Sequence, residues 1–395
     1  MRRHRTTFVG LVAVAATSLL LAFMFFAAGC GGDETTTTAA PTETTAPPTT
    51  SSETTAPPTT TAELTKLTLY TPLPVPTIAM MMPFVAAGAG FFAEEGLEVE
   101  IISSDSSTFE VAQLSSGKGD AGLIVAGSAI GAFAQAQPLI AVWEMITHPV
   151  FDLITPDGGP IMSMADLKGK QIGVEEAQSG EIPVLKADLR AAGVDIDKGD
   201  AQLVPLGDDY APILPKLESG EIAAMSSSYN SLVQLIAQGY TYRSLLPPVD
   251  PETAYPEVPL VVHKDLYQNN PQAVVGLARA MSKALVFAKA NPDAALAIMK
   301  EAFPPEHEDP AFTRKYMDRA IFMSWPVSDD LPFGQMSLSG AQALVDVLVD
   351  PSSPSGLEKS FDVSPYFTID LIDQINDFDR AAVEKQAAES TLTYP

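Results

Sequence analysis

The sequence has a single cysteine, Cys30, among its 395 residues. One cysteine excludes an intramolecular disulfide, so any folded domain in this chain must be held together by its apolar core. It also excludes the cysteine-rich zinc sites of small metal-binding domains. The thiol is therefore better explained by its position near the N terminus than by a role inside a fold.

Basic residues are scarce as well, because 23 Lys and Arg stand against 49 Asp and Glu, for a formal net charge of −26. An acidic chain repels the phosphates of DNA and RNA, so we expect no nucleic-acid partner. The chain has four histidines and lacks the G-x-S-x-G motif of a nucleophilic serine. We therefore expect a protein that is not an enzyme and that uses no cofactor and no metal.

The N terminus is first basic and then apolar. Three arginines precede an apolar stretch at 8–26, which is followed by AAGC at 27–30. This order is typical of a secretory signal, and AAGC resembles the bacterial lipobox, whose cysteine carries a diacylglycerol. We predict a lipoprotein signal peptide at 1–29 and a lipid anchor on Cys30, at the extracytoplasmic face of the cell membrane. The alternatives are a plain signal peptide and, because the stretch is long enough, a single-pass anchor.

The next segment has no large apolar residue. Residues 33–63 are mostly Thr, Pro, Ala, Ser and Glu, and the octet ETTAPPTT occurs twice. Such a composition cannot bury enough apolar surface to offset the entropy of ordering, and Pro-Pro pairs keep the chain extended. We predict a disordered tether over 30–63 that lifts a folded domain off the membrane.

From residue 64 onward the pattern alternates between strands and helices. Strands are predicted at 66–70, 97–102, 122–125, 139–143, 170–174, 201–205 and 222–225, and helices at 78–92, 110–116, 129–136, 182–192, 214–219 and 231–238. From about residue 271 the chain is predicted to be helical. This alternation predicts mostly parallel sheets covered by helices, and roughly 330 residues fit two lobes rather than one small core.

Four stretches also carry a resemblance to a known family: AAGAGFFAEEGLEVEII, SSGKGDAGLIVAG, MADLKGKQIGV and PKLESGEIAAM. In this order they resemble motifs of the SsuA/THI5-like (NMT1-type) family of ABC-transporter substrate-binding proteins. The resemblance implies a type II periplasmic-binding-protein fold, with two α/β lobes of mostly parallel sheets joined by two crossing segments. Residues 64–150 and 264–395 would form lobe I, and residues 151–263 would form lobe II.

The resemblance also implies a function. The protein would be a monomeric extracytoplasmic receptor that captures a small molecule by closure of its lobes and docks on an ABC permease. The family's ligands include sulfonates, nitrate-like anions, and aromatic or pyrimidine thiamine-precursor molecules. A membrane-tethered sensor or adhesin with the same lobes is an alternative. A pyrimidine-synthesis enzyme of the THI5 type is another, although those enzymes use a cysteine-rich segment that this chain lacks.

Ligands of open α/β sheets bind where the strands end, beside helix N termini. The polar residues predicted to bind ligand in four such loops, together with an aromatic residue at a strand end, are Thr71, Thr77, Gly127, Ser128, Trp143, Gln178, Ser179, Gly180, Ser226, Ser227, Ser228 and Tyr229. Helix capping is the alternative for the hydroxyl residues, and a place in the core is the alternative for the tryptophan. Because basic residues are few in these loops, a dicarboxylate or phosphate ligand is disfavoured.

Overall fold

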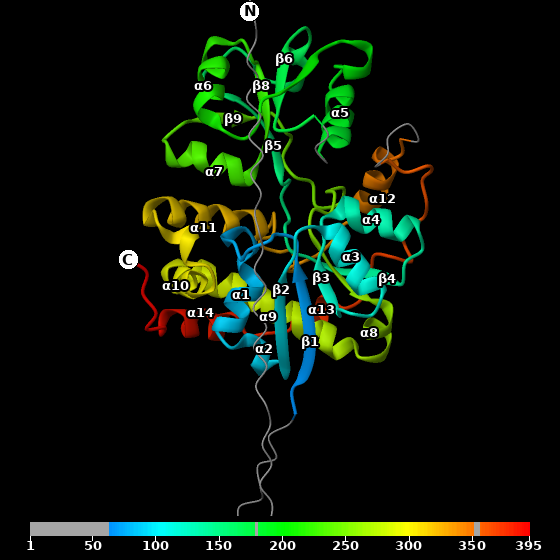
Figure 1. Ribbon diagram of the computed structural model, residues 1–395, viewed down its shortest axis with the longest axis vertical. Coiled ribbons are helices and arrows are strands. Elements are labelled where there is room, and N and C mark those ends of the chain that lie inside the picture. The colour runs from blue at the N-terminus through cyan, green and yellow to red at the C-terminus, as the bar shows by residue number, and fades with distance from the viewer. Residues whose placement is uncertain (1–62, 178–180, 351–355) are drawn as a thin grey trace, which may run out of the picture. The chain divides into compact units, whose positions relative to one another are not determined.

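The computed structural model describes residues 63–177, 181–350 and 356–395. The first of its two sheets has the strand order β2-β1-β3-β10-β4 (Figure 1), formed by Leu97–Ser103, Thr65–Thr71, Ala121–Leu123, Pro259–His263 and Leu139–Glu144. β1 runs parallel to β2 and β3, whereas β10 runs antiparallel to β3 and β4. Four strands therefore run in one direction and β10 alone is reversed in this sheet.

The second sheet repeats this plan. Its order is β7-β6-β8-β5-β9, formed by Gln202–Pro205, Gln171–Val174, Ala224–Ser228, Phe151–Pro156 and Tyr242–Ser244. β6 runs parallel to β7 and β8, and β5 runs antiparallel to β8 and β9. Here β5 is the reversed strand, so both sheets are mostly parallel, as the sequence predicts.

Helices accompany both sheets. The helices that precede β5 or follow β10 in the chain are η1 (Ile78–Met80), α1 (Met81–Gly88), α2 (Phe91–Glu94), α3 (Ser107–Ser115), α4 (Ala126–Ala134), α8 (Lys264–Asn269), α9 (Pro271–Ala290), α10 (Pro292–Ala302), η4 (Pro304–His307), α11 (Pro310–Ser324), α12 (Leu338–Val347), α13 (Ile372–Ile375) and α14 (Arg380–Ala388). The helices between β5 and β10 are η2 (Met164–Leu167), α5 (Ile182–Ala191), η3 (Ile196–Lys198), α6 (Tyr210–Ser219) and α7 (Tyr229–Ala237).

The first sheet is buried on both faces because successive side chains of a strand point to opposite sides. On β1, Leu69 belongs to the core shared with α1, α9, α10 and α11, whereas Tyr70 belongs to the core shared with α4 and α12. β10 follows the same rule, with Leu260 in the first core and Val261 in the second. These continuous apolar strands are typical of a sheet covered on both faces.

Several boundaries differ from the sequence prediction. The helix predicted at 78–92 is divided into η1, α1 and α2, because Gly90 adopts a left-handed backbone with φ of 84° that a continuous helix does not allow. Strands β5, β9 and β10 were not predicted. β10 hydrogen-bonds within the first sheet although it lies in the range 151–263 proposed for lobe II, so strand pairing moves that boundary to before Pro259.

No helix in the described part of the chain is long and apolar enough to cross a membrane. The apolar stretch at 8–26, Cys30 and the proposed tether lie outside the described residues, apart from the tether's last residue, Glu63. The signal peptide, the lipid anchor and the disorder of the tether therefore stay predictions.

Candidate ligand-binding site

Two crossing segments connect corresponding edges of the two sheets. Residues 145–150 run from the end of β4 to the start of β5, and residues 245–258 run from the end of β9 to the start of β10. Because β5 and β10 are the reversed strands, both connections join the carboxyl-end edge of the first sheet to the carboxyl-end edge of the second. We call these two edges the facing edges. They are where open α/β sheets bind ligands.

The first predicted loop contributes two buried hydroxyl groups. Thr71 is the last residue of β1 and is 1% exposed, and Thr77 occupies the N-cap position of η1. The Thr77 side chain does not cap η1, so the capping alternative does not explain it. Neither hydroxyl has a hydrogen-bond partner among the described residues. Their predicted role in binding a ligand stays a prediction.

Gly127 and Ser128 lie inside the first turn of α4 rather than before it, because the helix begins at Ala126 with Val125 as its N-cap. Gly127 is exposed and Ser128 is half-buried. The backbone N–H of the N-cap residue Val125 donates to Ser107 Oγ at 3.0 Å. The end of β3 thus presents a helix start at the facing edge, as predicted, with a shift of a few residues.

Trp143 is 1% exposed and belongs to the core of the first sheet. Its ring lies against Gly334, where an added Cβ atom would come within 1.8 Å of the indole. This is the core placement given above as the alternative. Gln178, Ser179 and Gly180 lie outside the described residues, so their predicted role stays a prediction.

The serine cluster at the end of β8 divides into different environments. Ser226 and Ser227 are buried, and Ser227 Oγ hydrogen-bonds the Tyr210 hydroxyl of α6. Ser228 caps α7, since its Oγ accepts from the backbone N–H of Ser231 at 3.4 Å. Its own N–H and Oγ both donate to Glu175 Oε1, at 2.8 and 3.1 Å.

Tyr229 follows this cluster as the first residue of α7 and is 3% exposed. Burial raises the pKa of its hydroxyl well above the usual value, and this hydroxyl makes no hydrogen bond within the described part of the chain. Its ring lies 6.4 Å from that of Tyr316 on α11, centroid to centroid. Tyr229 therefore brings an unpaired hydroxyl from the second sheet to residues that pack on the first.

α7 and α11 are joined by polar contacts that the sequence did not predict. The Tyr316 hydroxyl donates to Asn230 Oδ1 at 2.6 Å. Lys315 Nζ donates to the carbonyl oxygens of Ile236 and Ala237, at 3.2 and 3.1 Å, where α7 ends. A cation at a helix C terminus is favourable because the last carbonyl groups there are otherwise unsatisfied.

Glu110 is a further buried group near the facing edge that sequence reasoning missed. It is fully buried in the first turn of α3, which follows β2, and its Oε1 accepts from Ser104 Oγ at 3.0 Å. Burial raises the pKa of its carboxyl to about 8, and the Ser104 hydroxyl opposes this rise. The sequence placed Glu110 on a helix but gave no sign that its carboxyl turns inward.

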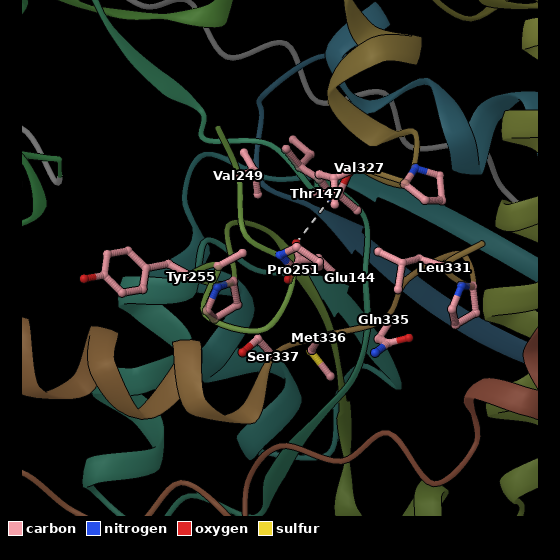
Figure 2. Close-up of a pocket in the computed structure, with 15 residues that line it drawn as sticks. Glu144, Thr147, Val249, Pro251, Tyr255, Val327, Leu331, Gln335, Met336 and Ser337 are labelled. Carbon is pink, nitrogen blue, oxygen red and sulfur yellow. Dashed lines mark hydrogen bonds between the residues drawn. The ribbon is translucent and has the colours of Figure 1, made fainter. Parts of the chain in front are cut away.

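A cavity of about 40 Å³ lies beside the crossing segments, and we call it the crossing cavity (Figure 2). Its walls come from both crossing segments and from residues 326–337; they are Glu144, Ile146, Thr147, Val249, Pro251, Ala254, Tyr255, Pro256, Pro326, Val327, Leu331, Pro332, Gln335, Met336 and Ser337. Within the described chain, none of the residues predicted to bind ligand lines it. The crossing cavity is therefore separate from those residues.

Over residues 63–177, 181–350 and 356–395 there is no group of three or more His, Cys, Asp or Glu side chains placed to hold a metal ion. The three histidines in these ranges make contacts that fit structural roles. His263 Nδ1 accepts from the N–H of Asp265 at 3.1 Å, and His307 Nδ1 lies 3.0 Å from the Tyr394 hydroxyl. His148 Nδ1 lies 3.4 Å from the carbonyl oxygen of Met323.

The family model described as NMT1/THI5 like matches residues 78–295, which is more than half of the chain. The chain belongs to the NMT1/THI5-like family. This confirms the resemblance seen in the four sequence stretches.

Two curated relatives of this NMT1/THI5-like chain have names that concern pyrimidines. The formylaminopyrimidine-binding protein of Halalkalibacterium halodurans is 28% identical over 221 residues, which make up 55% of this chain and 64% of that protein. The 4-amino-5-hydroxymethyl-2-methylpyrimidine phosphate synthase of Schizosaccharomyces pombe is 28% identical over 131 residues, 33% of this chain and 37% of that protein. The chain thus spans less than two thirds of the length of either relative.

A solved structure shows the fold of the family. The periplasmic aliphatic sulphonate binding protein SsuA from Escherichia coli matches with a TM-score of 0.55 and 17% identity, over 72% of this chain and 91% of that one. Identity at this level is informative about the fold alone. Together with the two five-stranded sheets, it confirms the predicted periplasmic-binding-protein fold with two α/β lobes.

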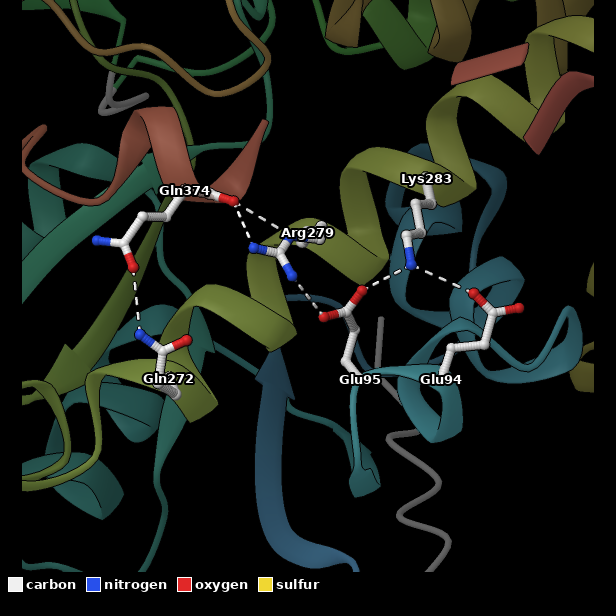
Figure 3. Close-up of polar contacts among 6 residues, drawn as sticks. All are labelled: Glu94, Glu95, Gln272, Arg279, Lys283 and Gln374. Carbon is white, nitrogen blue, oxygen red and sulfur yellow. Dashed lines mark hydrogen bonds and ion pairs between the residues drawn. The ribbon is translucent and has the colours of Figure 1, made fainter. Parts of the chain in front are cut away.

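One of the family-like stretches, GFFAEEGLEVE, has a structural role (Figure 3). Phe91 and Phe92 of α2 are buried in the core. Glu95 accepts from Arg279 Nη1 at 2.9 Å and from Lys283 Nζ at 2.6 Å, and both cations belong to α9. The motif therefore fixes α2 and the start of β2 against α9 and does not reach the facing edges.

Proposed function

We propose that this protein is the extracytoplasmic solute-binding receptor of an ABC importer. A lipid on Cys30 holds it to the cell membrane, and the tether at 30–63 gives the two lobes room to move. A small molecule enters between the facing edges and is enclosed when the lobes close, because contacts to both lobes stabilise the closed form by their differential affinity. The closed receptor, a monomer, then docks on its permease.

The observation that carries this proposal is the set of buried hydroxyl groups at the facing edges. Thr71 and Thr77 come from the first sheet and its following loop, and Tyr229 comes from the second sheet's side. Each hydroxyl lacks a hydrogen-bond partner among the residues that the structure describes. A buried polar group without a partner is costly, and a ligand that bonds to these groups removes that cost.

The chemistry of the edges favours a neutral or weakly basic ring over an anion. The acid Glu175 lies next to the end of β8 and would repel a sulfonate or nitrate. Burial raises the pKa of Tyr229 and that of Asp152, and the positive charge of Arg319 on α11 opposes both rises. This charge is therefore shared with an acid. Hydroxyl groups and carboxyls suit the ring nitrogens and amino groups of a pyrimidine-type molecule.

A binding role fits the residues better than catalysis does. The pyrimidine synthase relative covers one third of this chain, and the contacts of His148, His263 and His307 fit structural roles. A tethered sensor or adhesin would use the same lobes without a permease. We therefore make the permease part of the test.

The test is thermal unfolding of the purified full-length protein against aminopyrimidines, riboflavin, alkanesulfonates, nitrate and amino acids. A true ligand at 100 times its dissociation constant adds about 2.7 kcal/mol to the free energy of unfolding. A shift with an aminopyrimidine, followed by ligand-dependent co-purification of a permease, supports the proposal. A folded protein that responds to no compound contradicts the proposed ligand classes, and a hit without any permease favours the sensor.

A further inference from the structure

The side chains that line the crossing cavity are mostly apolar. Four of the lining residues are prolines: Pro251, Pro256, Pro326 and Pro332. Valine, leucine, alanine, isoleucine and methionine make up most of the other lining residues. Among the fifteen lining residues, all within the described chain, Glu144 is the charged one and no lysine, arginine or histidine occurs. The cavity is thus mostly apolar, with one acid and the uncharged polar residues Thr147, Tyr255, Gln335 and Ser337.

Glu144 ends β4 and is 4% exposed. Its Oε1 accepts from the backbone N–H groups of Val258 at 2.8 Å and Ile146 at 3.3 Å, so this oxygen ties the two crossing segments together. Its Oε2 is buried and makes no hydrogen bond within the part of the chain that the structure describes. Figure 2 shows the carboxyl among the lining side chains.

A structural role accounts for one oxygen of Glu144 and not for the other. A glutamine at this position would also accept both backbone N–H groups through its carbonyl oxygen. Glu257 lies beside Glu144, where its acid group raises the pKa of the Glu144 carboxyl and its backbone N–H lowers it by hydrogen bonding. A buried carboxyl with an unsatisfied oxygen and an acid beside it is unfavourable unless a cation or a donor from outside completes it.

The cavity also limits the size of such a group. Its volume of about 40 Å³ exceeds the roughly 10–15 Å³ that one water molecule needs, so a group of a few heavy atoms fits. The apolar walls suit a short carbon chain, and the acid suits a positive charge. We propose that the crossing cavity is a second ligand site, which pairs the ammonium group of a small alkylamine with Glu144 and holds its carbon chain against the prolines.

The proton balance of this step follows from the surroundings of the carboxyl. Burial and then the neighbouring Glu257 raise the pKa of Glu144 to about 8, against hydrogen bonds from the backbone that lower it. The pKa of Glu257 is also raised to about 8 by burial. From the other segments, Tyr255 lines the cavity, and the exposed Asp329 and Asp330 do not.

At pH 7 the Glu144 carboxyl is therefore mostly protonated. An alkylammonium ion keeps its own proton and pairs with the carboxylate, so the carboxyl proton leaves to solvent. One cation enters, close to one proton leaves, and no bond to carbon changes. The cavity borders the facing edge at the end of β4, but none of the described residues of the proposed transport site lines it, so the two sites can be tested separately.

The test is calorimetric titration of the full-length protein with propylammonium chloride at pH 7, in two buffers of different ionisation enthalpy. We expect saturable binding with release of close to one proton. Propan-1-ol has the same shape without the charge, and propionate has the opposite charge, so neither should bind. Equal binding of propanol, or no saturable binding of propylammonium, overturns the proposal.

Variants assign the binding to this cavity. Glu144→Gln should weaken propylammonium binding by at least about tenfold and abolish proton release. Val327→Trp, which fills the cavity from the 326–337 wall, should weaken it equally, and it decides the matter where Glu144→Gln does not fold. Glu252→Gln makes the same charge change at an exposed residue of the second crossing segment that does not line the cavity, and it should bind normally. Unchanged affinity in the variant with the filled cavity contradicts the site.

Discussion

Removing the Tyr229 hydroxyl should leave the fold unharmed and weaken the ligand. Tyr229 is buried, and its hydroxyl has no hydrogen-bond partner among the described residues. An unsatisfied buried polar group costs about 1–3 kcal/mol, and phenylalanine keeps the ring and its packing. We therefore expect Tyr229→Phe to change the free energy of unfolding by an amount between zero and a gain of about 2 kcal/mol.

Tyr316 supplies a matched control, because it is also a buried tyrosine and its ring lies near that of Tyr229. Its hydroxyl does have a partner, Asn230 Oδ1 at 2.6 Å. Tyr316→Phe removes this bond, so it should lose about 1 kcal/mol. The same chemical change should thus have opposite signs at two neighbouring positions.

Urea unfolding of the three proteins measures both effects, since the midpoint and slope give the free energy in water. The strongest binder from the thermal panel is then titrated into each protein. The reasoning requires a weaker complex for Tyr229→Phe without loss of stability. A loss above about 1 kcal/mol in Tyr229→Phe would show that the hydroxyl is already paired, and unchanged ligand affinity would remove Tyr229 from the site.

Three further outcomes are expected. Ser228→Ala removes the cap of α7 and the contact to Glu175, so it should lose about 1 kcal/mol of stability in urea unfolding and also weaken the ligand; an unchanged unfolding midpoint contradicts the capping role. Glu95→Gln breaks the pairs with both cations of α9, so it should lose about 3 kcal/mol, and a loss near zero would mean that solvent screens these pairs. The raised pKa of Glu110, about 8, means that the unfolded chain ionises first as pH rises. Stability should therefore fall between about pH 4.5 and 8, by about 1.4 kcal/mol per pH unit for one such group, and this slope should be shallower in Glu110→Gln than in the unmodified protein.

The parallel strands were predictable because their signal is local. The stretches KLTLY and LEVEII alternate between apolar and polar residues, which is typical of strands. The structure places them in β1 and β2, as predicted. The reversed strands β5 and β10 and the short β9 were missed, since each pairs only with segments that are distant in the sequence. β10, for example, hydrogen-bonds to β3, more than a hundred residues earlier.

The candidate site, too, was predictable only in part. Strand ends and helix starts pointed to Thr71, Ser228 and Tyr229 because position alone marks them. Which hydroxyls are already paired was not predictable, because Ser228 depends on Glu175, 53 residues away in the chain. The inward carboxyl of Glu110 was hidden for the same reason, since its burial comes from tertiary packing.

The position of β10 has a consequence for the order in which the two sheets can form. β10 fills the gap between β3 and β4, which do not pair with each other, yet it follows every strand of the second sheet in sequence. A chain that emerges from its N terminus can therefore complete the second sheet first, while β3 and β4 keep open edges. Open edges invite pairing with other chains, so aggregation should be most acute in the interval before Pro259–His263 arrives.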